Sequence, residues 1–170
     1  MKIVHAQIYP LLIPLIEPIK MSGETVCFAK TVLLGLKNNF GRTGWGEASA
    51  APLMTGETIE SLSANIKYLA SNIKDLNWDN PDEYGQQLGK FLYANSSAKS
   101  CIEMALLDLY TQEKGIPLWR YLRTKRGFAE ASIPKPLPLL RMLGGSIDKE
   151  ITDAKRLREE GYRYWKVKVG

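Results

Sequence analysis

The chain opens with apolar and β-branched stretches separated by turn residues. Residues 2–13 and 25–36 are rich in Ile, Val, Leu and Thr, and a third, shorter stretch covers residues 43–47. Asn and Gly within residues 37–41 supply the positive-φ positions that a hairpin turn requires. We therefore expect three antiparallel strands, with residues 17–24 forming a loop that contains proline and glycine between the first two.

Helical periodicity then replaces the strand pattern. One apolar stripe recurs at steps of three and four behind a start at Thr55–Thr58, and a second follows the first-turn proline Pro81. A third and stronger stripe is capped by Ser96 or Ser97 and stops near Gly115. The stripes consist of Ile59, Leu62, Ile66, Leu69 and Ile73, then Tyr84, Leu88, Phe91 and Leu92, then Ala98, Cys101, Ile102, Ala105, Leu106 and Leu109. We expect three helices whose stripes form a core.

The pattern changes again near residue 130. Residues 133–140 are rich in proline and then apolar, a helical stripe begins after Ser146 and stops at Gly161, and a further strand follows. A strand, a helix of about a dozen residues and a second strand form a βαβ unit, which implies parallel strands. The predicted fold class is α+β, with an antiparallel sheet and helices over residues 1–130 and the start of a parallel unit over residues 131–170.

The final strand carries the most distinctive chemistry. Side chains alternate along a strand, so Lys166 and Lys168 lie on one face with their Cα atoms about 7 Å apart. Where water is excluded, each ammonium disfavours the charge of the other, which makes a lysine a better base. The alternative is an edge strand whose lysines discourage pairing with another sheet. These residues alone leave both interpretations open.

Composition narrows the class of protein. With 45% hydrophobic and 24% charged residues, the 170-residue chain is typical of a globular domain and not of a disordered one. The net charge is +5, and the densest basic run is Arg120, Arg123, Lys125 and Arg126. This run has no glycine loop and no nucleic-acid-binding motif, so it indicates a solvated helix end and loop. We expect no nucleic-acid partner.

The remaining special residues indicate neither a metal framework nor a membrane segment. Cys27 and Cys101 are far apart and show no CxxC pattern, so we expect reduced, buried thiols. His5 is the single histidine and cannot build a histidine-rich metal site. The apolar residues 11–16 are too few for a signal peptide, and no stretch approaches the roughly 20 apolar residues of a membrane helix. A cytoplasmic protein without membrane contact is expected.

Several short segments occur in an order and at a spacing that span almost the whole chain. They are Tyr9–Leu11 with Ile13–Leu15, Gly44–Ala48, Thr55–Thr58, Ala98–Lys99 leading into Glu103–Leu109, Gly115–Leu118, and Glu160–Gly161 followed by Lys166–Gly170. Each is weak alone. Together they resemble the enolase superfamily, in particular its mandelate racemase and muconate lactonizing enzyme branch with a lysine-x-lysine motif.

The resemblance implies a capping domain followed by a (β/α) barrel, with the active site at the carboxyl ends of the barrel strands. It implies that Lys168 is the base that abstracts or returns the proton α to a carboxylate, and that Lys166 supports it electrostatically. It also implies Mg²⁺, which stabilises the enediolate. A small-molecule carboxylate is the expected substrate, and a homo-oligomer is the expected assembly.

In such enzymes two loops of the cap close over the substrate. The resemblance places Met21 and Ser22 in the first loop and Leu53, Met54 and Thr55 in the second. Methionine side chains suit an apolar or adaptable pocket. Ordinary surface loops are the alternative.

The chain also departs from the family. A complete barrel needs eight strands and about 250 residues of its own, whereas the pattern after residue 130 provides two strands. The acids in that part fall on the linker or the crossover helix: Glu130, Asp148, Glu150, Asp153, Glu159 and Glu160. We therefore expect the chain alone to bind no Mg²⁺ and to turn over nothing, as the first part of a racemase, epimerase or cycloisomerase. The alternative is a truncated, non-catalytic relative that acts as an oligomerising or interaction module.

Overall fold

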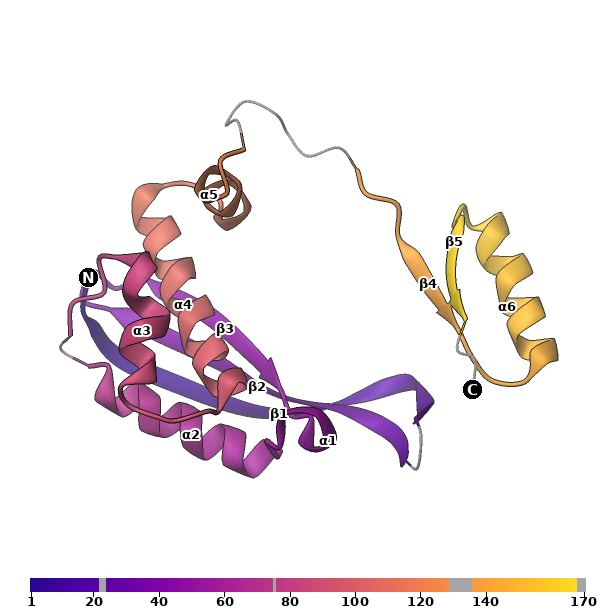
Figure 1. The fold of residues 1–170 in the computed structure, drawn as a ribbon, viewed down its shortest axis with the longest axis horizontal. Coiled ribbons are helices and arrows are strands. Elements are labelled where there is room, and N and C mark those ends of the chain that lie inside the picture. Colours follow the sequence, from indigo (N-terminus) through magenta and orange to yellow (C-terminus); the bar gives the residue numbers. More distant parts are fainter. Residues whose placement is uncertain (22–23, 75, 129–135, 168–170) are drawn as a thin grey trace. The chain divides into compact units, whose positions relative to one another are not determined.

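The computed structural model describes residues 1–21, 24–74, 76–128 and 136–167, without the side chains of Lys20, Met21 and Glu24. The chain divides into two compact units, Met1–Glu130 and Ala131–Gly170. The first unit is drawn from indigo to orange in Figure 1, and the second from orange to yellow.

The first unit is built on an antiparallel sheet. Its strands are β1 (Ile3–Met21), β2 (Glu24–Asn38) and β3 (Thr43–Ser49), in the order β1-β2-β3. Asn38 shapes the turn between β2 and β3, because its Oδ1 accepts hydrogen bonds from the backbone N–H groups of Phe40 and Arg42 at 3.1 and 3.0 Å. The prediction of three antiparallel strands is confirmed.

The first strand is longer than the sequence suggested. We expected a loop from residue 17, but β1 continues to Met21, so the prediction is wrong for residues 17–21. The pairing with β2 shifts register between Pro14 and Ile19, and this irregular stretch accommodates Pro18. Since β1 is an edge strand, a proline that lacks an N–H group is tolerated there.

Helices cover one face of this sheet (Figure 1). The helices α2 (Ile59–Asn72) and α4 (Ser96–Lys114) make the contacts to the strands, α2 to β1 and β2, and α4 to β2 and β3. The shorter elements are α1 (Pro52–Thr55), the 3₁₀ helix η1 (Pro81–Glu83), α3 (Tyr84–Gly89) and α5 (Leu118–Lys125). The α2 and α4 stripes are buried as predicted.

One of the helical predictions needs correction. The second predicted helix ends at Gly89, and Phe91 lies beyond it while still packing against the core. The basic run 120–126 covers the second half of the short helix α5 and its C-cap, Arg126, in agreement with the predicted helix end. The rings of Tyr110 in α4 and Tyr121 in α5 pack edge to face at 5.5 Å, and this contact holds the short helix in place.

The core lies between the sheet and the helices. Its fully buried side chains include Ile3, Leu34, Leu36, Leu62, Ile66, Leu69, Ile102 and Leu106. Cys101 is buried as expected. Cys27 is exposed, against expectation, because it lies on the outer part of β2, where residues 25–30 contribute no buried side chain.

The second unit is a βαβ unit. It consists of β4 (Leu140–Leu143), α6 (Ile147–Glu159) and β5 (Tyr164–Val167), and β4 and β5 pair in parallel. Ser146 caps α6, since its Oγ accepts a hydrogen bond from the backbone N–H of Lys149 at 3.4 Å. The parallel unit confirms the prediction, but its first strand begins at Leu140, later than the expected residues 133–140, because prolines interrupt that stretch. With the antiparallel sheet and its helices, it makes the fold class α+β.

Candidate functional site

Lys166 lies on the face of β5 that points away from α6. It pairs with Met142 of β4. The alternate positions carry the packing against the helix, because Leu143 and Leu157 are the buried apolar residues of the described part of this unit. In a (β/α) barrel the helices form the outer ring, so this face of β5 corresponds to the barrel interior.

Lys166 is exposed, and the described part of β5 extends one residue further, to Val167. Catalytic groups of (β/α) barrels occupy the carboxyl end of the strands. Lys168 lies outside the described residues, so the predicted pairing of the two lysines stays a prediction.

A buried donor lies next to Lys166 on the opposite face. The indole Nε1 of Trp165 is buried and has no hydrogen-bond acceptor among the described residues. Buried donors are almost always paired in folded proteins.

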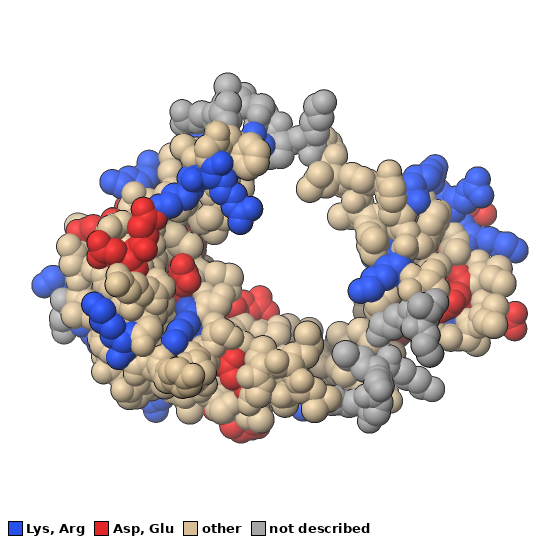
Figure 2. All heavy atoms as spheres, in the orientation of Figure 1, with Lys and Arg blue, Asp and Glu red and all other residues tan. Residues whose placement is uncertain are grey.

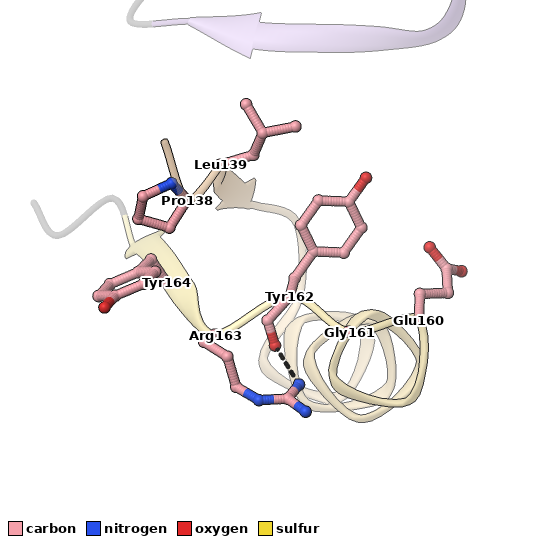
Figure 3. Close-up of a pocket in the computed structure, with 7 residues that line it drawn as sticks. All are labelled: Pro138, Leu139, Glu160, Gly161, Tyr162, Arg163 and Tyr164. Atoms are coloured by element: carbon pink, nitrogen blue, oxygen red, sulfur yellow. Dashed lines mark hydrogen bonds between the residues drawn. The ribbon is translucent and has the colours of Figure 1, made fainter. Parts of the chain in front are cut away.

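The pocket of the second unit lies at the other end of the strands. It has a volume of about 260 Å³ and is lined by Pro138, Leu139 and residues 160–164, which precede β4 and β5 (Figure 3). Figure 3 shows the Arg163 guanidinium turned back toward the end of α6, where its Nη1 donates to the backbone oxygen of Tyr162 at 2.8 Å. This pocket is separate from the carboxyl end where Lys166 lies.

In the first unit, the second predicted cap segment is a one-turn helix and not a loop. Pro52 provides the first helical position of α1, and Gly56 closes the turn at φ +76°. Leu53 and Met54 project from it with 84% and 83% of their surface exposed. Thr55 bonds back to its own turn, since its Oγ1 donates to the Ala51 oxygen at 3.3 Å.

The first predicted cap segment is only partly described. The backbone of Met21 ends β1, its side chain lies outside the described part, and Ser22 is not among the described residues. The role of Met21 and Ser22 as a substrate loop stays a prediction.

Glu57 anchors the segment that follows α1, and it was not among the predicted site residues. Only 3% of its surface is exposed, and its carboxylate accepts hydrogen bonds from the backbone N–H groups of Ser97 at 3.1 Å and Ala98 at 3.3 Å. These groups belong to the first turn of α4, where unpaired N–H groups and the helix dipole favour a negative charge. The sequence signal that could have identified Glu57 is its position directly after Gly56, a glycine in the left-handed conformation at the end of a helix.

A polar pocket of about 330 Å³ lies where β3 meets the start of α4. It is lined by Glu47, Ala48 and Ser49 of β3 and by Ser96, Ser97 and Ser100 of α4. Glu47 is fixed there, because its Oε1 accepts a hydrogen bond from Thr31 Oγ1 at 2.7 Å.

The described residues do not fit a Mg²⁺ site. Within residues 1–21, 24–74, 76–128 and 136–167, no three His, Cys, Asp or Glu side chains come together to hold a metal ion. Asp153 of α6 is used within the helix, because its carboxylate pairs with Lys149 at 2.7 Å. Figure 2 shows lysine and arginine side chains gathered over α5, where a metal cation would be repelled. In the same described ranges, no helix has the length and apolar character needed to cross a bilayer.

An antiparallel sheet covered by helices, followed by a parallel βαβ unit, defines the start of an enolase-type fold. Residues 3–122 match the family described as the N-terminal domain of mandelate racemase / muconate lactonizing enzyme. Since the match covers more than half of the chain, the chain belongs to this family.

Similar proteins of known activity include epimerases and a cycloisomerase. The L-Ala-D/L-Glu epimerase of Bacillus subtilis is 28% identical over 180 aligned positions, which span 100% of this chain and 45% of that protein. Muconate cycloisomerase 1 of Acinetobacter baylyi is 32% identical, over 93% of this chain and 42% of that protein. The chain therefore spans less than half the length of these relatives.

A solved structure shows the same fold. The dipeptide epimerase of Cytophaga hutchinsonii, complexed with Mg and the dipeptide D-Ala-L-Val, superposes with a TM-score of 0.86 at 26% identity. The superposition covers 100% of this chain and 45% of that one. The predicted resemblance and fold class are confirmed.

Proposed function

We propose that these residues supply the capping domain and the first barrel strands of a Mg²⁺-dependent isomerase that removes a proton α to a carboxylate. The position of Lys166 supports this proposal, because the residue lies on the face of β5 that points away from α6, and this face would be the interior of a (β/α) barrel. The family match over residues 3–122 supports it. Racemases, epimerases and cycloisomerases of this kind share an enediolate intermediate.

In the proposed reaction, the neutral Nζ of Lys168 takes the proton from the α carbon. The electron pair of the broken C–H bond enters the enediolate, and an acid outside the described residues, proposed to lie across the substrate from Lys168, returns a proton to the opposite face of the same carbon to complete the epimerisation. Lys166 lies two residues earlier on the same face and places positive charge beside the developing oxyanion. Bound Mg²⁺ supplies further positive charge to the enediolate. Its ligands are proposed to come from residues outside the described part of this chain.

Dipeptides are the proposed substrate class. The support is that the B. subtilis relative is an L-Ala-D/L-Glu epimerase and that the C. hutchinsonii relative holds D-Ala-L-Val. A second candidate reaction is cycloisomerisation of a muconate-type dicarboxylate, which the A. baylyi relative favours. Because the Mg²⁺ ligands are proposed to lie outside the described part, we propose that the 170 residues alone bind no catalytic Mg²⁺ and turn over neither substrate.

Proton exchange in deuterated water tests the proposal. The protein as its gene encodes it and the 170-residue chain are each incubated with Mg²⁺ and a panel of L,L- and D,L-dipeptides, and loss of the α-proton signal is followed by NMR. We expect exchange with the encoded protein, a decrease of at least about 10³-fold in Lys168→Ala, as is usual for loss of an acid–base group, and no exchange with the 170-residue chain.

Two results would overturn the proposal. Exchange that persists at full rate in Lys168→Ala would remove the assigned base. Absence of exchange with the dipeptides, and with the lactone that forms when a muconate cyclises, would instead favour the non-catalytic module. Lys166→Ala is the companion variant, and we expect a smaller decrease because the base is retained.

A further inference from the structure

The strand β3 forms one outer edge of the antiparallel sheet, since it lies last in the order β1-β2-β3 (Figure 1). In an antiparallel sheet, the N–H and C=O groups of alternate residues point toward the paired strand, and those of the residues between point away from it. The Trp45 N–H and the Thr43 carbonyl bond to α4, so the odd-numbered residues 43–49 direct their backbone groups away from β2. We call these backbone groups the β3 edge.

Side chains of α4 close the first half of the β3 edge. The Asp108 Oδ2 accepts a hydrogen bond from the Trp45 N–H at 2.8 Å, and the Gln112 Nε2 donates one to the Thr43 oxygen at 2.9 Å. A strand edge that is covered in this way does not pair with a further strand. The helix therefore protects the sheet over residues 43–45.

The second half of the β3 edge is open. Asp108 and Gln112 are four residues apart on α4, and the same spacing continues toward the helix start through Met104, Ser100 and Ser96. A thioether is a weak acceptor and a serine side chain is short, and these three side chains make no bond to β3 among the described residues. The space beside residues 47–49 is the pocket of about 330 Å³. Its volume is at the lower end of the roughly 300–1,000 Å³ range of small-molecule sites.

Four serine hydroxyl groups line this pocket, and they belong to Ser49, Ser96, Ser97 and Ser100. Within the described part of the chain, these hydroxyls have no hydrogen-bond partner. Other helical hydroxyls of the protein bond back to the preceding turn, as the Ser63 Oγ does to the Ile59 oxygen at 2.6 Å. The hydroxyls of the pocket are therefore available to a ligand, both as donors and as acceptors.

One carboxylate gives the pocket its charge. The Glu47 Oε1 accepts a hydrogen bond from Thr31 Oγ1 at 2.7 Å, which fixes the group, and its second oxygen has no such bond among the described residues. The nearby N–H groups of Ser97 and Ala98 are already bonded to Glu57. A ligand in this pocket therefore meets a negative charge, hydroxyl groups and the β3 edge, and not the N–H groups that begin α4.

We propose that this pocket binds the main chain of a short peptide that has a free α-ammonium group. The ammonium group donates to the Glu47 carboxylate, and the next N–H of the peptide donates to the Glu47 backbone oxygen. The following carbonyl or carboxylate of the peptide accepts from the Ser49 N–H and from the serine hydroxyls. The peptide is short because α4 closes the edge at Trp45 and α1 begins at Pro52.

The inference goes beyond the proposed function, because all of its contacts lie within Met1–Glu130. It requires neither Mg²⁺ nor Lys168. Binding in the presence of EDTA, and binding to the Lys168→Ala variant, are therefore expected whether or not the protein abstracts a proton. The binding test succeeds or fails independently of the exchange experiment.

Titration calorimetry of the encoded protein in EDTA, with L-Ala-L-Val and its N-acetyl derivative, tests the site. We expect the unmodified dipeptide to bind. N-acetylation should weaken binding at least about tenfold, because it removes a hydrogen-bonded charge. Glu47→Gln should weaken binding of the unmodified dipeptide by the same factor and leave binding of the N-acetyl derivative unchanged. This coupling assigns the ammonium group to Glu47.

Hydrogen exchange followed by mass spectrometry locates the bound peptide. We expect L-Ala-L-Val to slow exchange of the segment that contains the Glu47 and Ser49 amides. Ser100→Gln places a longer amide side chain beside the open edge, as Gln112 does at the other end. It should abolish binding of both peptides and leave the fold intact, as measured by circular dichroism.

A matched control separates the site from net charge. Glu60 is exposed in the first turn of α2, which contacts β1 and β2. Glu60→Gln changes the net charge as much as Glu47→Gln does and is expected to leave peptide binding unchanged. An equal effect of the two variants would assign the change to total charge and overturn the proposal.

Three further results would also overturn it. The first is a protein that binds no L-Ala-L-Val in EDTA. The second is a Glu47→Gln variant that binds the dipeptide as tightly as the unmodified protein does. The third is slow exchange of the Glu47 and Ser49 amides that is already present without peptide and unchanged by it, since another segment of the protein would then cover the β3 edge.

Discussion

Gly46 of β3 lies directly against the backbone of Cys101 in α4. A Cβ atom added to Gly46 would overlap the Cys101 carbonyl oxygen, and one added to Gly44 would overlap the carbonyl oxygen of Ala105. The helix therefore rests on the strand backbone itself, with small residues at the contact on both sides. This close approach seats the strongest helix of the cap on the sheet.

Gly46→Ala should destabilise the first unit. The added methyl group forces strand and helix apart, and overpacking of this kind costs about 1–3 kcal/mol. We expect a value at the upper end, about 3 kcal/mol, because the clash is with backbone and not with a flexible side chain. Urea unfolding followed by circular dichroism measures the change.

Gly85→Ala in α3 is the matched control. A Cβ atom at Gly85 meets no atom within 4 Å, and alanine favours a helix over glycine by up to about 1 kcal/mol. Stability should be unchanged or slightly higher. If Gly46→Ala costs no more than this control, the direct contact between β3 and α4 is wrong.

The parts of the fold that the sequence predicted well are those set by local periodicity. Leu62, Ile66 and Leu69 recur with a helical period and are fully buried in α2. The alternation that placed Lys166 and Val167 on opposite faces of a strand needs only the strand itself. Both patterns are independent of what lies elsewhere in the chain.

The parts that it missed depend on distant contacts. Pro18 is typical of a loop, but the pairing of β1 with β2 continues past it to Met21. α5 has a charged sequence and is held by the ring of Tyr110 on another helix. Glu57 lies 40 residues before the N–H of Ser97 that it binds. Of the candidate site, the sequence placed Lys166 correctly on its strand. A metal site needs acids brought together by tertiary structure, and the described residues bring none together.

Glu57→Ala should cost about 1–3 kcal/mol, because it leaves the buried N–H groups of Ser97 and Ala98 without their acceptor. Glu57→Gln should cost less, since the amide oxygen still accepts one bond but the negative charge at the helix start is lost. Urea unfolding ranks the two variants. The control is Glu103→Gln in the middle of α4, expected to change stability by less than about 0.5 kcal/mol. A Glu57→Ala variant as stable as this control would contradict the role.

The two cysteines should react very differently. Burial raises the pKa of the Cys101 thiol from 9.0 to about 12, with a smaller contribution from Glu47, whereas Cys27 is exposed. At pH 8, Ellman's reagent should modify one thiol per native chain and both thiols in urea. Cys27→Ser should remove the native reaction. Rapid labelling of Cys101 in the native Cys27→Ser variant would contradict its burial.

The same raised pKa predicts a loss of stability at alkaline pH. The folded chain keeps the Cys101 thiol protonated while the unfolded chain releases its proton from about pH 9. The free energy of unfolding therefore does not depend on this thiol below pH 9, and it decreases as the pH rises from 9 toward 12. Cys101→Ala lacks the titrating group, so its stability should fall less steeply across this range than that of the unmodified chain. Parallel slopes for the two proteins, measured by urea unfolding at each pH, would contradict the assignment.

Leu53 and Met54 offer a test of substrate contact that is separate from stability. Both side chains project from α1 with more than four-fifths of their surface exposed, at 84% and 83%, so truncating them removes little folding energy. If α1 closes over an apolar dipeptide, as the resemblance implies for Leu53 and Met54, Leu53→Ser with Met54→Ser removes two hydrophobic contacts. At roughly 1 kcal/mol each, KM for an apolar dipeptide should rise about tenfold or more while kcat stays nearly constant. Steady-state kinetics of the encoded protein gives both constants.

Phe40 provides the comparison for this pair. It is 65% exposed and lies in the turn between β2 and β3, so Phe40→Ser removes a similar apolar surface at another place. We expect it to leave KM unchanged. A rise in KM that Phe40→Ser reproduces would mean that general loss of surface apolarity, and not contact with the substrate, is responsible. A KM that stays constant in the Leu53 and Met54 variant would remove α1 from the substrate pocket, because no other effect of these exposed side chains would mask a lost contact.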